Sequence, residues 1–435
     1  MSLKDFTRNR WTKFVFWALL YAAWVVWLGN FWWLFGLVVI FDIFITKKVR
    51  WNFWKKRYAE GEKHSSANDW LDAIIFAVIV VTFINIFFFQ AFKIPSSSME
   101  RSLYTGDHLF VSKLTYGPRV PETPLTIPFT HNVIFGRESY STLIHRDYRR
   151  LKGIRELRRG DCVVFGFPNG DTVLRKAPME DYHALVRMAG RKAVIDNLGP
   201  VVVRPVDKKD HYVKRCVAVP GDTLQVIDGL VWVNGEQQTV YPGVQLSYRV
   251  VTTGQRINSK TIQKLGINAS ELYFDAGLPG YPAMPLTAEM LDEVKALPNV
   301  TEVTANLERI AADSREMFPF TPDSQWTRDF FGPLWIPKKG ATVSINEENI
   351  ALYERIIRDY EHGDVQKALE EGNYSFRQDY YFMMGDNRHN SLDSRYWGFV
   401  PEDHIVGRPA VIWLSTDKGN RFPNNIRWRR FLKFV

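Results

Sequence analysis

The sequence is poor in cysteine and has no internal repeat. Its 435 residues include only Cys162 and Cys216, too few for a disulfide framework or a cysteine-rich zinc cluster. A composition of 46% hydrophobic and 24% charged residues, with scattered Gly and Pro, excludes disordered, collagenous and coiled-coil proteins. The length allows about two or three domains. Whether the two cysteines pair or remain free thiols is left open by their spacing.

The body of the chain has little net charge, although the whole carries +9. Residues 1–69 hold 11 Lys and Arg against 5 Asp and Glu, and the last 15 residues hold 5 Lys and Arg with no acid. Residues 70–420 therefore carry a net charge of −2. Basic ends on a nearly neutral body argue against nucleic acid as a partner and favour contact with a lipid bilayer.

Charged residues are absent from residues 73–92. Twenty helical residues span about 30 Å, the thickness of the hydrocarbon core, so we expect a transmembrane helix here rather than a buried core helix. Residues 1–45 contain an earlier apolar stretch, interrupted at Gly29-Asn30. This stretch predicts either one tilted span or a short hairpin, and its length disfavours a cleaved signal peptide.

The connector 46–72 is rich in Lys and Arg. Because cytoplasmic loops of membrane proteins are enriched in these residues, we expect this loop inside the cell and everything after residue 92 outside. The number of spans before residue 46 stays open, since a single first span would place the basic N-terminal tail outside, whereas a hairpin would keep both flanks inside.

Beyond the membrane segment, the pattern predicts a mainly β body with a mixed α/β insertion. Short runs rich in β-branched and aromatic residues predict strands; these runs are 161–167, 211–219 and 380–384. Asp228-Gly229 suits a tight turn, so 224–235 predicts a hairpin, and apolar spacing predicts helices in 285–313 and 346–371. The expected parts are 93–240 as the first part of the body, 241–375 as the insertion, and 376–435 as its last part with a basic tail.

Several groups in this body are candidates for chemistry. A serine cluster, Ser96 to Ser98, follows the membrane segment, but serine becomes a nucleophile only beside a base. None of the nine His residues accompanies a Gly-x-Ser-x-Gly elbow, which leaves a Ser-Lys arrangement. Lys214 is the best candidate base, since strand alternation places it beside Tyr212 and Cys216 and burial would lower its pKa.

A third polar segment, 383–408, predicts a turn held by its own hydrogen bonds. There Asp393 can pair with Arg395 or with Arg215. Taken singly, the serine cluster, the lysine and this loop also fit a solvated turn, an exposed edge-strand lysine and an ordinary structural loop.

In combination, four ordered blocks resemble bacterial type I signal peptidases, the membrane-bound Ser-Lys serine proteases that remove signal peptides. The blocks are IPSSSM (94–99), RRGDCVVF (158–165), YVKRCVAVPGD (212–222) and GDNRHNSLDSRYWGFVPEDHIVGR (385–408). Eukaryotic members have His where Lys214 stands, so the lysine indicates the bacterial form. The resemblance covers about 150 residues by its motifs and the anchors by layout only.

Carried over residue by residue, the resemblance assigns Ser98 as nucleophile and Lys214 as general base. Ser96 would join the Ser98 backbone N–H in the oxyanion hole. The supporting residues would be Ser391, which orients the lysine, and the ion pair of Asp393 with Arg395, near Arg215. The substrate pocket is expected to use apolar side chains, each of which also suits plain core packing: Phe92, Ile94, Met99, Leu103 and Val213.

The resemblance further implies an endopeptidase that cleaves preproteins after Ala-x-Ala sites, needs no metal or cofactor, and sits in the bacterial inner membrane with its catalytic domain outside. One departure is Arg101 with Ser102, where the family usually has Pro-Thr; without proline's fixed φ, the turn after Ser98 is expected to be held differently. The segment 118–158 is longer than expected, and nothing in its sequence explains it.

Two other functions compete with this interpretation. Self-cleaving repressors of the SOS response also use Ser and Lys on a β fold, but they are soluble and bind DNA, which residues 73–92 disfavour. An inactive membrane-anchored binding or assembly protein with the same fold is the remaining alternative. Cleavage assays on Ser98 and Lys214 variants would distinguish enzyme from scaffold.

Overall fold

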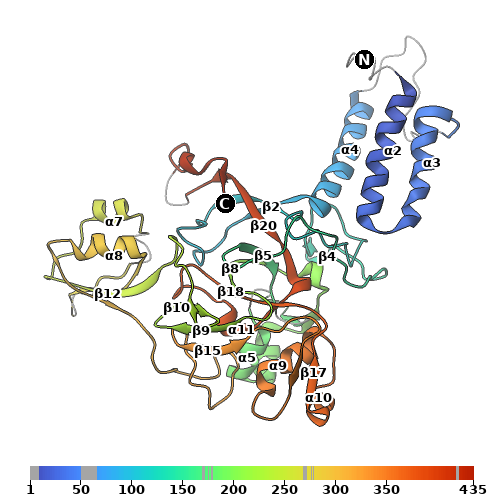
Figure 1. The fold of residues 1–435 in the computed structure, drawn as a ribbon. Coiled ribbons are helices and arrows are strands. Elements are labelled where there is room, and N and C mark those ends of the chain that lie inside the picture. Colours follow the sequence, from blue (N-terminus) through green and yellow to red (C-terminus); the bar gives the residue numbers. More distant parts are fainter. Residues whose placement is uncertain are drawn as a thin grey trace.

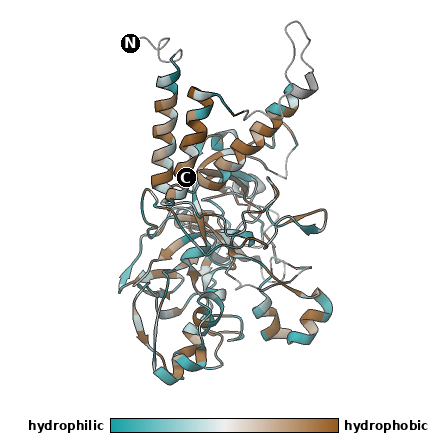
Figure 2. Ribbon diagram, turned by 90° about the vertical axis from the view of Figure 1, so that its right-hand side faces the viewer, coloured by the Kyte–Doolittle hydropathy of each residue, from teal (hydrophilic) through white to brown (hydrophobic). Residues whose placement is uncertain are grey.

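The computed structural model describes residues 9–49, 66–168, 172–174, 176–177, 180–267, 272–275, 277, 279–417 and 421–435. Residues 50–65, most of the basic connector predicted to be cytoplasmic, lie outside the described residues. Three apolar helical segments stand together at one end of the molecule, and the β-rich body lies at the other (Figures 1 and 2).

The first apolar stretch forms a helical hairpin, one of the two predicted alternatives. Helix α2 (Arg10–Leu28) ends at Gly29, whose φ of 63° is favourable for glycine, and Asn30 caps the return leg. Phe41 on that leg packs against the rings of Trp11 and Phe14. The return leg consists of η1 (Phe31–Phe35), α3 (Gly36–Phe41) and η2 (Asp42–Thr46).

Helix α4 (Ser66–Phe87) lies beside α2, where Trp24 contacts the rings of Phe83 and Phe87. Arg10–Leu28 and Asp69–Phe87 are long and apolar enough to cross a membrane. The helix ends five residues before the predicted residue 92, because Phe89–Lys93 forms strand β1 instead. Antiparallel pairing of β1 with β2 satisfies this backbone.

One antiparallel sheet organises the body, with strand order β1-β2-β20-β5-β8-β18-β19 and β21 beside β20. The strands predicted from 161–167, 211–219 and 380–384 are confirmed as β5, β8 and β18. The bounds are β1 (Phe89–Lys93), β2 (Asp107–Ser112), β5 (Cys162–Gly166), β8 (His211–Ala218), β18 (Tyr380–Met384), β19 (Val400–Pro401), β20 (Ile405–Ser415) and β21 (Lys433–Phe434).

The predicted hairpin is also confirmed, as β9 (Thr223–Ile227) and β10 (Leu230–Val233). Its turn residues, Asp228 and Gly229, both have positive φ, at 51° and 75°, as a type I′ turn requires. The hairpin belongs to a second, four-stranded sheet of order β11-β10-β9-β15, which also contains β11 (Glu236–Gln237) and β15 (Phe331–Trp335).

The predicted insertion 241–375 consists of two different parts. Its first part has its own apolar core, whereas the second packs on the body, against the core beneath β9, β10 and β18. The first part comprises β12 (Leu246–Thr252), α7 (Ser259–Leu265), β13 (Gly280–Leu286), α8 (Ala288–Lys295) and β14 (Val300–Ala305). The second contains β15, β16 (Thr342–Ser344), α9 (Ile350–Arg355), η5 (Ile356–Tyr360), α10 (Val365–Glu371) and β17 (Asn373–Ser375).

The helix predicted for 285–313 is correct only over α8. The chain leaves the helix because residues 300–305 add a strand beside β12, and pairing with a distant strand overrides the local apolar spacing. Helix is confirmed over most of 346–371, with a break between η5 and α10.

The unexplained segment 118–158 lies beneath the hairpin and contacts its tip. Arg149 donates to the carbonyl of Leu28 at 2.5 Å, and Trp27 Nε1 donates to the carbonyl of Lys152 at 3.0 Å. The segment carries β3 (Val133–Ile134) and β4 (Arg137–Glu138).

The remaining elements of the described chain are short. They are β6 (Thr172–Leu174), α5 (Tyr182–Ala189), α6 (Arg191–Leu198), β7 (Val201–Val203), η3 (Val206–Lys208), α11 (Ser394–Trp397), η6 (Glu402–His404) and η7 (Trp428–Arg430).

Candidate active site

Ser98 and Lys214 meet although 116 residues separate them in the chain. Lys214 Nζ, on β8, donates to Ser98 Oγ at 2.5 Å. The two side chains are almost enclosed, because Ser98 is 9% exposed and Lys214 3%. As the strand pattern predicts, Tyr212 lies on the same face, with its ring centroid 5.9 Å from Lys214 Nζ. A hydroxyl and an amine in contact, shielded from water, are the two parts of a Ser-Lys dyad.

The surroundings of Lys214 favour its neutral form. Burial lowers the pKa of Lys214 to about 8; Asp393 acts in the opposite direction, and Arg395 adds to the lowering. No carboxylate of the described residues forms an ion pair with the ammonium of Lys214. An amine whose pKa lies near neutrality can accept a proton at physiological pH.

The turn that carries Ser98 is held by its own backbone and by the loop after β18. The amide of Leu103 bonds to the carbonyl of Met99 at 2.7 Å, and the amide of Asn387 bonds to the carbonyl of Ser98 at 3.0 Å. Asn390 Nδ2 donates to Ser97 Oγ at 3.0 Å. These bonds fix the backbone on both sides of the serine hydroxyl.

Arg101 takes a left-handed conformation in this turn, with a φ of 72°. Proline, whose ring fixes φ near −65°, cannot adopt it. The turn is therefore held differently from one with proline at this position, as the sequence predicts. Its neighbour Ser102 donates its hydroxyl to Asp386 and so attaches the end of the turn to the loop after β18.

Two buried Asp–Arg pairs flank the dyad. Asp393 pairs with Arg395 through Nε at 2.9 Å and Nη2 at 2.8 Å, which is one of the two predicted pairings. Arg215 pairs instead with Asp386, at 2.7 and 2.6 Å. Burial by itself would raise the pKa of Asp393, but Arg395 and the amide of Gly385 hold that pKa below its usual value. The Asp393 carboxylate therefore stays charged, and the two ion pairs keep the loop in place.

Ser391, predicted to orient the lysine, lies near the dyad without bonding to it. Its hydroxyl is buried and has no hydrogen-bond partner among the described residues. It packs against Gly385, where an added Cβ would overlap Ser391 Oγ and stand 2.7 Å from the carbonyl oxygen of Ser98. Glycine at 385 therefore allows Ser391 and Ser98 to approach each other.

Ser96 lies at the mouth of the site. Its side chain is exposed, and its Oγ is 3.5 Å from Ser98 Oγ. The backbone N–H of Ser98 donates to no other group in the described part of the chain. A hydroxyl and an N–H on the same short segment are the donors that an oxyanion hole needs.

The five predicted pocket residues belong to one apolar cluster around the dyad. Ile94, Met99 and Leu103 are almost fully buried, at 3% exposure or less. Phe92 and Val213 are only partly buried and pack at the edge of the cluster. The first three therefore support the base of the site, and the last two remain accessible to a ligand.

The two cysteines are free and buried. They occupy adjacent strands but belong to different clusters, Cys162 beneath the Ser98 turn and Cys216 beside Trp397. Within the described ranges, no group of three or more His, Cys, Asp and Glu side chains is placed to hold a metal ion.

Sequence reasoning missed four residues that hold the site together: Ser102, Gly385, Asp386 and Asn387. The signal that could have found three of them is the Gly-Asp-Asn run that opens the last block. Their partners, however, lie more than 170 residues away in the chain.

Comparison with known proteins gives consistent results. Residues 67–269 and 335–414 match the family described as "Signal peptidase, peptidase S26". Signal peptidase I of Haemophilus influenzae is 27% identical over 387 residues, covering 87% of this chain and 78% of that protein. Signal peptidase I of Buchnera aphidicola is 23% identical over 92% of this chain and 93% of that protein. The Helicobacter pylori protein of the same name is 24% identical over 86% and 93%.

Proposed function

Because the chain belongs to the signal peptidase family, peptidase S26, we propose that Ser98 is its nucleophile and Lys214 its general base. The chain is a serine endopeptidase that removes signal peptides, and preproteins are its substrates. The observation that carries the residue assignment is the 2.5 Å contact between Lys214 Nζ and Ser98 Oγ in an almost enclosed site.

The proposed reaction has two stages. Neutral Lys214 takes the proton of Ser98 as Oγ attacks the scissile carbonyl, and the Ser98 N–H and the Ser96 hydroxyl stabilise the oxyanion. Protonated Lys214 then gives its proton to the leaving amine. Water deprotonated by the same lysine hydrolyses the acyl-enzyme and regenerates Ser98.

The substrate is proposed to bind as an extra strand along β1. This strand lies at one end of the eight-stranded sheet, so the main-chain groups on its outer edge are available for pairing. Phe92 and Val213, the accessible members of the apolar cluster, are placed to contact small side chains near the cleavage site. Shallow apolar contacts of this kind suit Ala-x-Ala sites.

We further propose that α2 and α4 anchor the enzyme in the bacterial inner membrane. Large apolar side chains such as Trp32 and Phe76 are exposed, and lipid would cover them. The described part of the basic connector, Lys47 and Lys48, begins at the end of the helices away from the body. Cytoplasmic placement of this connector puts the body and Ser98 outside.

Cleavage of a preprotein with an Ala-x-Ala site by the detergent-solubilised full chain tests the assignment. We expect Ser98→Ala and Lys214→Ala to lose activity by about 10³-fold or more while remaining folded. Ser97→Ala is the matched control, because it removes only a hydrogen bond with Asn390 and should change the rate by less than about tenfold. Full activity of Lys214→Ala would disprove the dyad, and inactivity of the wild type would favour the scaffold alternative.

A further inference from the structure

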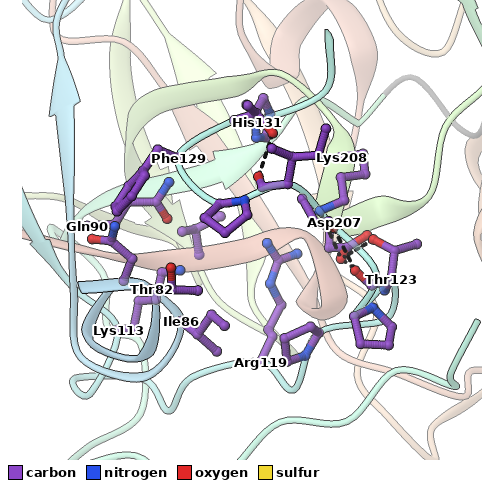
Figure 3. Close-up of a pocket in the computed structure, with 18 of the residues that line it drawn as sticks. Thr82, Ile86, Gln90, Lys113, Arg119, Thr123, Phe129, His131, Asp207 and Lys208 are labelled. Carbon is purple, nitrogen blue, oxygen red and sulfur yellow. Dashed lines mark hydrogen bonds and ion pairs between the residues drawn. The ribbon is translucent and has the colours of Figure 1, made fainter. Parts of the chain in front are cut away.

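A second site lies where the body meets α4. A cavity of about 400 Å³ is walled by the last turns of α4, by β1 and by residues between 119 and 131 (Figure 3). Thr82 and Ile86 of α4 lie on one side, Thr123 and Asp207 on the other, and Arg119 between them. Neither Ser98 nor Lys214 lines this cavity.

The cavity has an excess of positive charge. Lys113, Arg119 and Lys208 line it together with a single carboxylate, that of Asp207. Asp207 is already engaged by Lys208 at 3.7 Å and by the hydroxyl of Thr123 at 2.8 Å. In the described part of the chain, Lys113 Nζ has no hydrogen bond or ion pair, and Arg119 Nη1 donates to the carbonyl of Asp403 at 2.7 Å.

The charge of Arg119 disfavours the charged form of Lys113. Glu122 and Asp207 act favourably on Arg119, but neither forms an ion pair with it or with Lys113 in the described part of the chain. Burial, and then the charges of Arg119 and Lys208, lower the pKa of Lys113 to about 7, although Asp207 acts in the opposite direction. Partly buried charges without a counter-ion are unfavourable, and a bound anion relieves that cost. The cavity is thus better matched to a negatively charged group than to an empty or neutral state.

The rim of the cavity is apolar. Ile127 and Phe129 line it yet are 48% and 63% exposed, and Ile86 adds an apolar wall from α4. Thr82 stands five residues before the end of this helix, about 7.5 Å along its axis. Since we place α4 across the bilayer, the cavity opens at the depth of the outer headgroups and the adjoining acyl chains.

We propose that this cavity binds an anionic phospholipid, with the phosphate at Lys113 and Arg119 and the acyl chains against Ile86, Ile127 and Phe129. The inference rests on the proposed function only for the membrane placement of α4. A signal peptide is a poorer match, because the part of it that reaches this depth is its apolar or small-residue end, which carries no anionic group for Lys113 and Arg119.

The test is equilibrium binding of a short-chain phosphatidylglycerol to the full chain in zwitterionic detergent. The Ser98→Ala form is used throughout, so the result does not depend on whether the dyad is correct. We expect phosphatidylglycerol to bind at least about tenfold more tightly than phosphatidylcholine of the same chain length, since only the former carries a net charge.

Lys113→Gln should weaken phosphatidylglycerol binding by about tenfold or more, and Lys113→Arg should retain it. The matched control is Arg137→Gln, an exposed residue of the same segment that does not line the cavity; it should change binding by less than about twofold. Lys113 Nζ has no bonded partner to lose among the described residues, so Lys113→Gln decides the question even if Arg119 variants fail to fold.

Three results would overturn the proposal. Equal affinity of Lys113→Gln and its parent would show that the cavity does not hold the phosphate. Inorganic phosphate binding as tightly as phosphatidylglycerol would assign the cavity to a free anion. Displacement of phosphatidylglycerol by a synthetic signal peptide would assign it to the substrate.

Discussion

Two lysines, one just after a strand of the main sheet and one within it, have similarly lowered pKa values but different neighbours. Lys113 follows β2 and Lys214 lies in β8, and burial lowers their pKa values to about 7 and about 8. Lys214 contacts Ser98 Oγ at 2.5 Å in an enclosed site, whereas Lys113 faces an open cavity beside Arg119. A lowered pKa therefore does not identify a general base; the group within reach of the amine does.

The largest expected effect is the loss of cleavage when Lys214, but not an exposed lysine elsewhere, is replaced. Lys214→Met keeps most of the side-chain volume but removes the amine, so cleavage should fall by about 10³-fold or more. Lys264→Met, at an exposed site on α7, is the control and should leave the rate within about twofold. Steady-state cleavage assays measure both, and a substantial residual rate in Lys214→Met would remove the distinction between the two lysines.

A change in the loop behind the dyad should have the next largest effect. The Cβ of Gly385→Ala would push against Ser391 Oγ and the carbonyl oxygen of Ser98, moving Ser98 away from Lys214. A displacement of about 1 Å at a reacting atom costs about 10²-fold in rate. The expected signature is a fall in kcat without loss of the folded state, measured by kinetics and thermal unfolding together. Wild-type kcat in this variant would show that the turn tolerates the shift.

The pH dependence of kcat/KM should follow the protonation of Lys214 rather than that of Lys113. Only neutral Lys214 can accept the Ser98 proton, so kcat/KM should fall about tenfold per pH unit below about 8 and level off above it. The rate falls towards low pH because protonation of the base inactivates the enzyme. A profile that stays flat from pH 6 to pH 8 is the contrary outcome, and denaturation monitored at each pH is the control.

The smallest expected effect is a change in the pKa of Lys113, but not of Lys214, when a lipid anion is added. An anion bound in the cavity favours the charged form of Lys113, so its pKa should rise by about one unit when phosphatidylglycerol is added, which corresponds to about 1.4 kcal/mol. The pKa of Lys214, enclosed at the dyad, should not move. NMR of isotopically labelled lysines follows both residues in one sample, and equal shifts for both would contradict a local site at Lys113.

Local sequence signals were sufficient for the elements whose partners lie close in the chain. Asp228-Gly229 predicts its turn because few residues accept positive φ, and the alternation around Lys214 predicts the face it occupies. The end of α4 and the strand at 300–305 were not predictable in this way. Both are decided by pairing, with β2 and β12 respectively, that no local pattern contains.

The same limit applies to the site. The family resemblance predicted Ser98 and Lys214 as partners, but the sequence left Asp393 to pair with either Arg395 or Arg215 and did not predict Asp386 as the partner of Arg215. That choice depends on how the loop after β18 folds back against the Ser98 turn, where Ser102 bonds to the same carboxylate. Such a contact between distant segments has no local sequence signal.

The contacts of Arg149 and Lys152 with the hairpin tip attach the body to the helical hairpin at a second point, besides its chain connection through α4. A body attached through α4 alone could swivel about that helix, as on a single pivot. A second attachment at Trp27 and Leu28 opposes this rotation, so the body and the helices α2 and α4 move as one unit. With α2 and α4 across the bilayer, as proposed, Ser98 then keeps a constant orientation and height above the lipid surface, and each preprotein is cut at a fixed distance from the bilayer.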